Sequence, residues 1–193
     1  MGARRQMQDR RTVERVALGD LPALVIDRCQ LRCFEATVKD FSRTGCSIIS
    51  RNVAEFPVEF GLQIAEMEEL IIARVKWRRD NCAGVAFDWD EPALPDSRME
   101  KRVGVRIPAT ISNVDSDRLV RCTIREASKS GCRIETEHLR QLDNDVLISI
   151  EAMKTSLRGR IVWRDDPMAG VSLMWKTAKT APQLAAAATR IHQ

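Results

Sequence analysis

The stretch Asp40-Phe41-Ser42-Arg43-Thr44-Gly45 is a polar, turn-forming run between two apolar runs that have the pattern of β-strands. Ser128-Lys129-Ser130-Gly131 repeats this turn later in the chain. An arginine-rich cluster precedes each turn, at residues 10–15 and at residues 101–106. Two copies of one module, each pairing an arginine cluster with a small-residue turn, indicate an anion-binding receptor rather than an enzyme.

The two copies are related by a constant spacing of 86 residues. This spacing separates seven identical pairs: Ser42 and Ser128, Gly45 and Gly131, Cys46 and Cys132, Arg74 and Arg160, Trp77 and Trp163, Gly84 and Gly170, Trp89 and Trp175. A fixed period over so many positions indicates an internal duplication. The arginine clusters are 91 residues apart instead, so the first copy holds five extra residues around positions 19–22.

The first copy contains six short apolar runs at roughly ten-residue spacing, which predict β-strands. The expected strands are Leu21–Ile26, Leu31–Lys39, Cys46–Ser50, Val58–Ile64, Leu70–Trp77 and Cys82–Trp89. Pro22 near the start of the first run suggests an edge strand. The pattern is typical of a small barrel or sandwich, so the chain is expected to be all-β with two such units.

The composition shifts along the chain predict four segments. Residues 1–15 form a flexible basic arm and residues 16–90 the first β-domain. Residues 91–101, which contain two prolines, form a linker. Residues 102–193 form the second β-domain, which ends in a short Ala-rich amphipathic helix at residues 181–191.

The charge distribution argues against general nucleic-acid binding. The net charge of the 193 residues is +4, and it divides into −2 for residues 1–96 and +6 for residues 97–193. A nucleic-acid-binding protein more often shows a broad basic excess and interleaved aromatic residues. A nucleic-acid-binding pair of barrels that uses the basic arm therefore remains the weakest of three hypotheses.

The sequence predicts a cytoplasmic protein without a metal centre or a catalytic set. No apolar run approaches the roughly 18 residues that a membrane-spanning helix needs, and no secretory signal is present. The six cysteines form no C-x-x-C pair, and the two histidines have no zinc-like spacing from them. Cys46 and Cys132 follow the turn glycines and are expected to be small buried hydrophobic residues in a reducing environment.

The arginines and the first turn have complementary chemistry for a guanine nucleotide. Two arginines at positions i and i+4 present planar forks that suit phosphate oxygens and the guanine edge. The Asp40 carboxylate can accept from guanine N–H groups, and the Ser42 hydroxyl can donate to an acceptor of the ligand. Gly45 permits a positive φ or a close approach of the backbone to the ligand.

The chain resembles a tandem of PilZ domains over about residues 10–90 and 100–190, because each copy carries the two sequence signatures of that family. The R-x-x-x-R signature is matched by Arg11 and Arg15, and by Arg102 and Arg106. The [D/N]-x-S-x-x-G signature is matched by Asp40, Ser42 and Gly45 in the first copy, and by Ser128 and Gly131 in the second, where Glu126 replaces the Asp or Asn.

The resemblance implies two tandem six-stranded β-barrels that bind cyclic di-GMP and carry no other cofactor. It implies that the arginines clamp the phosphates and guanines and that the turn holds another face of the ligand. A basic residue just before the first arginine accompanies a stacked ligand dimer in the family, and Arg10 and Lys101 occupy that place here. Ligand binding would change the conformation and signal to an unidentified protein partner in motility, biofilm or exopolysaccharide control. The alternative is a nucleotide-independent PilZ-like adaptor in motility or pilus assembly.

Two further expectations concern the differences between the copies and the tryptophans. Glu126 is one methylene longer than aspartate, which favours the first copy as the better site. The repeated tryptophans are expected to pack in the core or between the domains rather than to serve as stacking platforms: Trp77, Trp89, Trp163 and Trp175.

Overall fold

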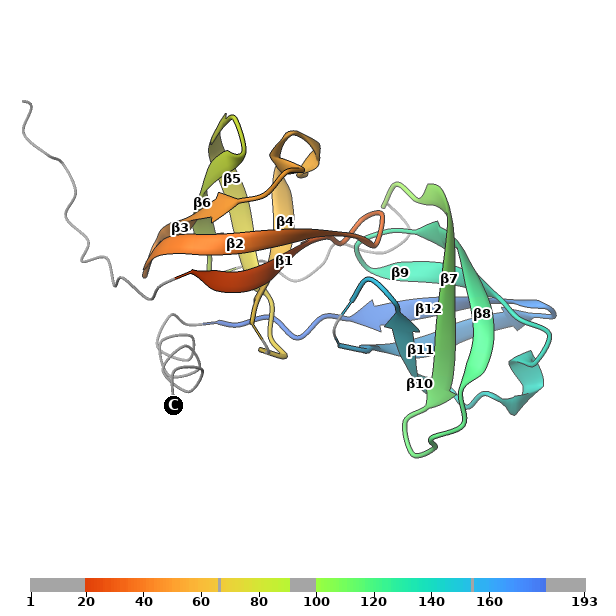
Figure 1. The fold of residues 1–193 in the computed structure, drawn as a ribbon. Coiled ribbons are helices and arrows are strands. Elements are labelled where there is room, and N and C mark those ends of the chain that lie inside the picture. Colours follow the sequence, from red (N-terminus) through yellow and green to blue (C-terminus); the bar gives the residue numbers. More distant parts are fainter. Residues whose placement is uncertain (1–19, 66, 91–99, 154, 180–193) are drawn as a thin grey trace, which may run out of the picture.

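The computed structural model describes residues 20–65, 67–90, 100–153 and 155–179. These residues form two closed antiparallel β-barrels of six strands each, which lie next to one another (Figure 1). The first barrel contains β1 (Leu21–Asp27), β2 (Arg32–Ser42), β3 (Gly45–Ile49), the 3₁₀ turn η1 (Val53–Glu55), β4 (Glu59–Ile64), β5 (Ile71–Arg79) and β6 (Cys82–Asp88). The second contains β7 (Val103–Asn113), β8 (Val120–Ala127), β9 (Gly131–Glu135), η2 (Leu139–Gln141), β10 (Asp145–Ile150), β11 (Leu157–Asp165) and β12 (Met168–Met174). The predicted basic arm, most of the linker and the C-terminal helix lie outside the described residues.

The two barrels share one strand order. The first closes as β1-β2-β3-β6-β5-β4, and the second closes through the equivalent series β7-β8-β9-β12-β11-β10. The registers also correspond, since Ala23 faces Ile64 in the first barrel and Ala109 faces Ile150 in the second. The all-β prediction is confirmed, and of the two architectures left open the barrel is the correct one.

Buried hydroxyl groups repeat the same local hydrogen bonds in both barrels. Ser50 donates its hydroxyl to the Glu35 carbonyl at 2.6 Å, and Thr136 donates to the Arg121 carbonyl at 2.9 Å. Each hydroxyl oxygen also accepts a backbone N–H two residues further along the chain. Because buried polar groups need partners, these bonds fix the chain where it leaves β3 and β9.

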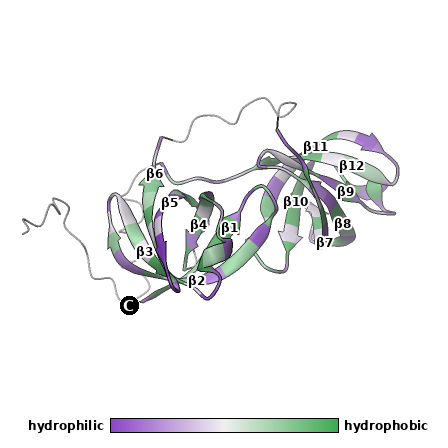
Figure 2. Ribbon diagram, turned by 90° about the horizontal axis from the view of Figure 1, so that it is seen from above, coloured by the Kyte–Doolittle hydropathy of each residue, from purple (hydrophilic) through white to green (hydrophobic). Residues whose placement is uncertain are grey.

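Alternation of buried and less buried residues along strands such as β9 and β10 places one face of these strands in the barrel core. Figure 2 shows apolar and polar residues along the strands of both barrels. The first core is rich in phenylalanine, and the ring centroid of Phe56 lies 5.6 Å from that of Phe34 and 5.8 Å from that of Phe60. The second core is aliphatic and is built on fully buried isoleucines: Ile111, Ile124, Ile134 and Ile148. Burial of these side chains is the main favourable contribution to each barrel's stability.

The expectation that Pro22 marks an edge strand is wrong. β1 pairs with β2 on one side and with β4 on the other, so the closed barrel has no edge at this strand. Pro22 is exposed, and its pairing with β4 has already ended, because that ladder begins at Ala23. A proline without an N–H is tolerated there because no ladder donor is needed. Pro108 holds the equivalent place in β7.

The segment after β12 runs back to the first barrel (Figure 1). Thr177 forms a parallel bridge with Leu70. The Leu70 N–H donates to the Lys176 carbonyl at 2.8 Å, and the Ala178 N–H donates to the Leu70 carbonyl at 2.8 Å. The buried core of the second barrel also continues into Leu24 and Ile26 of the first. The two barrels are therefore in direct contact.

Candidate ligand-binding sites

The fold brings the two predicted motifs of the second copy together. β7 runs antiparallel to β8, with Val103 facing Ala127 and Gly104 facing Glu126. The same register, continued beyond Val103, places Arg102 opposite Ser128 at the β8–β9 turn. Lys101, Arg102 and Arg106 are all exposed to solvent. The basic cluster and the turn thus form one surface at the end of the barrel where β7 begins.

Ser128 is used to build the turn. Its backbone N–H donates to the Gly131 carbonyl at 2.8 Å, and its hydroxyl lies 3.2 Å from the same oxygen. The side chain is almost fully buried. A Cβ on Gly131 would lie 2.7 Å from the Val171 carbonyl oxygen of the neighbouring strand β12. Serine and glycine are therefore required at these positions for the turn and for close packing of the strands.

Glu126 does not offer a free carboxylate in this structure. Its Oε1 lies 2.6 Å from a terminal guanidinium nitrogen of Arg133 on β9. The position equivalent to Arg133 in the first copy is Ser47, which cannot form such a pair. The departure of the second copy from the family pattern is thus a coupled change of two residues, an acid one methylene longer and the arginine that binds it.

The carboxylate of Glu100 accepts hydrogen bonds from donor groups of the same turn. Glu100 Oε2 accepts from the Ser130 N–H at 2.9 Å and from the Ser130 hydroxyl at 2.6 Å. Partial burial raises the pKa of Glu100, but the hydrogen bonds from Ser130 and from the Ser128 side chain outweigh it and hold the pKa below its ordinary value. Glu100 is therefore ionised at neutral pH, and a negative charge already lies at this turn.

In the first copy, the turn is shorter than the sequence suggested. β2 extends through Ser42, so only Arg43 and Thr44 form the turn, and the register shifts between Lys39 and Ser42. The positive φ falls on Asp40, at 49°, rather than on Gly45. Aspartate is one of the residues that tolerate this region.

Gly45 has a packing role that the sequence prediction did not identify. A Cβ at Gly45 would lie 2.0 Å from the Val85 carbonyl oxygen of β6. Because this atom belongs to the backbone of a paired strand, it cannot move aside as a side chain can. The close approach at Gly45 is thus between two strands of the barrel.

A surface pocket of about 300 Å³ lies beside the first turn. It is lined by Asp40, Ser42, Thr44, Gly45, Cys46, Ser47, Lys76, Trp77, Gly84, Val85 and Ala86. The Ser42 hydroxyl donates to the Gly45 carbonyl at 2.8 Å, so it shapes the turn as Ser128 does. The pocket combines a carboxylate, an ammonium group and an aromatic face, which suits a nucleotide. Arg10, Arg11 and Arg15, which were predicted to complete this site, lie outside the described residues.

The expectation for the tryptophans is wrong for one pair and confirmed for the other. Trp77 is 49% exposed and Trp163 is 37% exposed, and both indoles lie over a glycine on the neighbouring strand. Trp89 and Trp175 are partly buried and pack against the barrel cores. Their indole N–H groups donate to the Arg43 carbonyl at 3.0 Å and the Lys129 carbonyl at 2.7 Å, the equivalent residues of the two turns.

The turn of the second barrel contacts the first barrel through a cluster of charges. The Lys129 ammonium lies 3.0 Å from Glu59 Oε1 on β4. The Glu59 carboxylate also binds Arg28 at 3.2 Å and Arg74 at 3.1 Å. The Arg28 side chain is only 3% exposed, so this cluster is better shielded from solvent than an ordinary surface ion pair.

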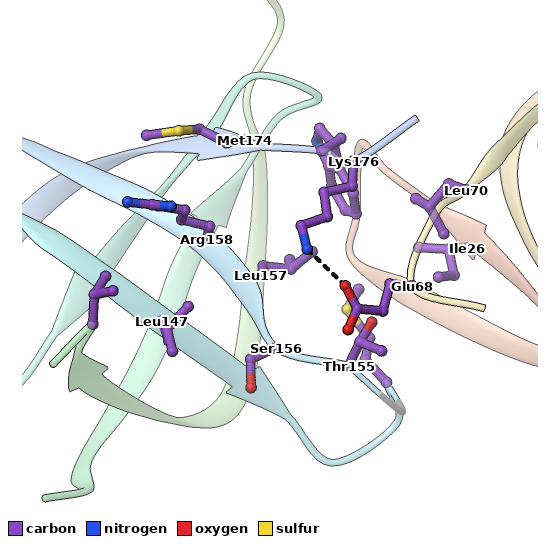
Figure 3. A pocket seen from close by; sticks show the side chains of 13 residues that line it. Ile26, Glu68, Leu70, Leu147, Thr155, Ser156, Leu157, Arg158, Met174 and Lys176 are labelled. Atoms are coloured by element: carbon purple, nitrogen blue, oxygen red, sulfur yellow. Dashed lines mark hydrogen bonds and ion pairs between the residues drawn. The ribbon is translucent and has the colours of Figure 1, made fainter. Parts of the chain in front are cut away.

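A separate cavity of about 350 Å³ lies between the barrels (Figure 3). Apolar side chains of both barrels line it, among them Leu70 and Leu157. Lys176 and Glu68, which form an ion pair at 2.7 Å, also belong to the lining. None of the signature residues contributes to this cavity. We interpret it as a space left where two curved barrel surfaces meet.

The buried thiols behave as hydrophobic residues. Cys46 and Cys132 are 7% and 8% exposed, as predicted. Burial, with a smaller effect of the neighbouring Cys122, raises the pKa of Cys132 to about 12, so the thiol stays protonated at neutral pH. In the part of the chain that the structure describes, no group of three His, Cys, Asp or Glu residues is placed to hold a metal ion. No helix in that part is long and apolar enough to cross a membrane.

Comparison with known families gives a match for the second barrel. Residues 96–184 match the family described as the PilZ domain. The match includes the whole of β7–β12, with Arg102, Arg106 and the Ser128-to-Gly131 turn on which the resemblance rests. The first barrel repeats the strand order of the matched barrel and its hydrogen bonds at the 86-residue spacing.

Several solved structures are similar to this chain over most of its length, at low sequence identity. PlzA of Borreliella burgdorferi in complex with c-di-GMP is 10% identical over 79% of each chain, with a TM-score of 0.33. The K. pneumonia MrkH–c-di-GMP complex is 10% identical over 89% of this chain and 85% of that chain, with a TM-score of 0.32. YcgR of Escherichia coli in complex with c-di-GMP is 7% identical over 89% and 82%, with a TM-score of 0.30. Scores this low establish no common arrangement of the two barrels. No curated protein matches the chain.

Sequence reasoning missed three parts of these sites. Trp77 was assigned to packing, although its recurrence at Trp163 marks a fixed position on the barrel surface. Glu100 precedes the basic cluster directly, but the sequence contains no signal that its carboxylate turns back to Ser130. The contact of Lys129 with Glu59 joins residues 70 positions apart, and no local pattern reports it.

Proposed function

We propose that this protein is a cyclic di-GMP receptor that changes conformation on binding its ligand and signals to a protein partner. The observation that carries the proposal is the pairing of Val103 with Ala127 and of Gly104 with Glu126, which supports a site shared by the arginine cluster and the signature turn. The PilZ family match and the two structurally equivalent barrels support the proposal. The chain would act as a receptor in the cytoplasm rather than as an enzyme.

In the second barrel, Arg102 and Arg106 supply the positive charge of the proposed site. Both side chains are exposed, and both can form bidentate hydrogen bonds with phosphate oxygens or with the O6/N7 edge of guanine. Lys101 adds a third cation at the same end of the barrel, where a second, stacked ligand molecule would be bound. Ser128 and Gly131 hold the turn in the shape that faces these side chains.

In the first barrel, the pocket beside Asp40 is the proposed site. Asp40 would accept from the N–H groups of a guanine, and the exposed face of Trp77 would stack on the base. Arg10, Arg11 and Arg15 of the preceding sequence would provide the phosphate contacts.

Replacing Trp77 with alanine is expected to weaken binding at the first barrel. Stacking of a base on an aromatic side chain contributes roughly 1–3 kcal/mol, so the loss is about 5- to 150-fold in affinity. The affinity would be measured from the NMR shifts of the amides of residues 40–45 during a titration. Trp163→Ala, which removes the equivalent side chain from the other barrel, is the matched control. Equal effects of both variants on these amides would contradict the stacking role.

Signal transmission is proposed to use the contact of Lys129 with Glu59. Lys129 lies inside the signature turn of the PilZ domain, and Glu59 belongs to the first barrel. A ligand bound at this turn would compete for the Lys129 ammonium and so alter the packing of one barrel on the other. Small-angle scattering curves that are identical with and without saturating ligand would contradict this step.

The test of the receptor function is a competition experiment with labelled cyclic di-GMP. The protein is expected to bind the labelled ligand, unlabelled cyclic di-GMP to displace it, and GTP and cyclic di-AMP to displace it poorly, because neither offers two guanines on one cyclic phosphate ring. Absence of binding by the intact protein would reject the receptor function. The nucleotide-independent adaptor would then be the better account.

A further inference from the structure

The carboxylate of Glu100 lies where an anionic ligand of the second barrel would bind. Glu100 directly precedes the basic cluster of residues 101–106, and its carboxylate lies within hydrogen-bond distance of Ser130 in the β8–β9 turn. One carboxylate oxygen takes both the backbone N–H and the hydroxyl of Ser130. These two donors belong to the signature turn itself.

Carboxylate and phosphate compete for the same kind of site. A turn that presents a backbone N–H and a hydroxyl beside a lysine is a small anion-binding concavity. Lys129 stands next to Ser130 in the chain, and its charge contributes to holding Glu100 ionised. A phosphate oxygen that approached Arg102 and this turn would meet the negative charge of Glu100 and would find the Ser130 donors already engaged.

Among the described residues, the first barrel shows no such arrangement at the corresponding position. Thr44 stands at the position of Ser130 and is exposed, and its hydroxyl and backbone N–H form hydrogen bonds with Ser42. The pocket of about 300 Å³ lies beside it. In the described part of the chain, the turn of the second barrel is thus bound to a carboxylate, whereas the corresponding residue of the first turn is exposed to solvent.

We propose that Glu100 is a built-in competitor for the anionic ligand of the second barrel, and that ligand binding displaces its carboxylate from Ser130. This inference rests on the proposed function, because the ligand considered is cyclic di-GMP. It goes further in predicting that the second barrel is inhibited by its own chain. Displacement of Glu100 would also move the residues that lead into β7, next to the contact of Lys129 with Glu59.

The experiment compares the intact protein with Glu100→Gln and Glu100→Ala. Cyclic di-GMP is titrated into isotope-labelled protein, and the amides of residues 101–104 and 128–131 report the second barrel separately from the first. Hydrogen bonds to a charged group are the stronger ones, so removing the competing charge is expected to raise the affinity of the second barrel about 10-fold. Glu137→Gln removes the same charge from an exposed position beyond β9 and should leave the affinity unchanged.

The outcomes separate the competitor from the receptor function. Tighter binding by both Glu100 variants, or binding by the variants when the intact protein does not bind, supports the competitor. Binding by all proteins with equal affinity, or weaker binding by the Glu100 variants, overturns the competitor and leaves the receptor function standing. Absence of binding by every protein rejects both. An equal gain in Glu137→Gln would assign the effect to overall charge and would also overturn the competitor.

Discussion

Replacing both Arg102 and Arg106 with alanine is expected to weaken cyclic di-GMP binding at the second barrel by about 30-fold or more. Each arginine that forms a bidentate contact contributes roughly 1–3 kcal/mol, and the two side chains are exposed to solvent. Titration calorimetry of the variant and of the intact protein measures the change. The stoichiometry should fall as well, because the first barrel keeps its own pocket.

The matched control for this variant is Arg118→Ala combined with Arg121→Ala. Both residues are exposed and lie in or after the β7–β8 loop, at the opposite end of β7 from Arg102. The control therefore removes the same charge from the same barrel without touching the proposed site. If the control weakens binding as much as the arginine-cluster variant, the interaction is general attraction to a basic domain, and the assignment of Arg102 and Arg106 fails.

Gly45→Ala is expected to lower the free energy of unfolding. The decrease should lie near the upper end of the roughly 1–3 kcal/mol that overpacking costs. The new methyl group would lie 2.0 Å from a backbone oxygen of β6, so β3 and β6 would have to separate. Urea denaturation followed by far-UV circular dichroism measures the change.

The glycines of the chain offer a graded comparison for this prediction. Gly131→Ala should cost less, because its methyl group would lie 2.7 Å from the corresponding oxygen, and Gly104→Ala should cost nothing, because no heavy atom lies within 4 Å. A Gly45→Ala protein as stable as the Gly104→Ala protein would show that the close approach of β3 to β6 is not required. The glycine of the signature would then need a direct role at the ligand.

The fold was predictable because its determinants are local and occur twice. The apolar runs of the first copy correspond to β1–β6 within a few residues, and the 86-residue repeat extends the prediction to the second barrel. Closure into a barrel was not decided by this pattern, since a sandwich has the same alternation. The misplaced edge strand at Pro22 has the same cause, because a proline shows where a ladder ends but not whether the sheet is closed.

The site residues were predictable as sequence motifs, but their partners were not. Ser42 and Ser128 shape the turns through carbonyl groups only three residues away, whereas the requirement for Gly45 depends on Val85 of β6. The positive φ at Asp40 coincides with a register shift that no residue pattern predicts. The pair of Glu126 with Arg133 forms when β8 pairs with β9, and the pair of Lys129 with Glu59 forms only when the two barrels are packed together.

The differences between the two barrels are the main consequence for function. In the first barrel, Asp40 and Trp77 line a pocket that is open to solvent. In the second, Glu126, the counterpart of Asp40, is bound to Arg133, and Ser130, the counterpart of Thr44, is bound to Glu100. The proposed competition by Glu100 would lower the affinity of the second barrel for its ligand.

The most direct test of the account is an NMR titration of the intact, isotope-labelled protein with cyclic di-GMP. The account predicts that the amides of residues 101–106 and of residues 126–131 shift together and saturate at the same ligand concentration, because the two segments form one site. The amides of the β7–β8 loop, including Arg118, should stay unchanged. Shifts confined to one of the two segments, or shifts centred on the loop, would contradict the claim that β7 and the β8–β9 turn bind the ligand jointly.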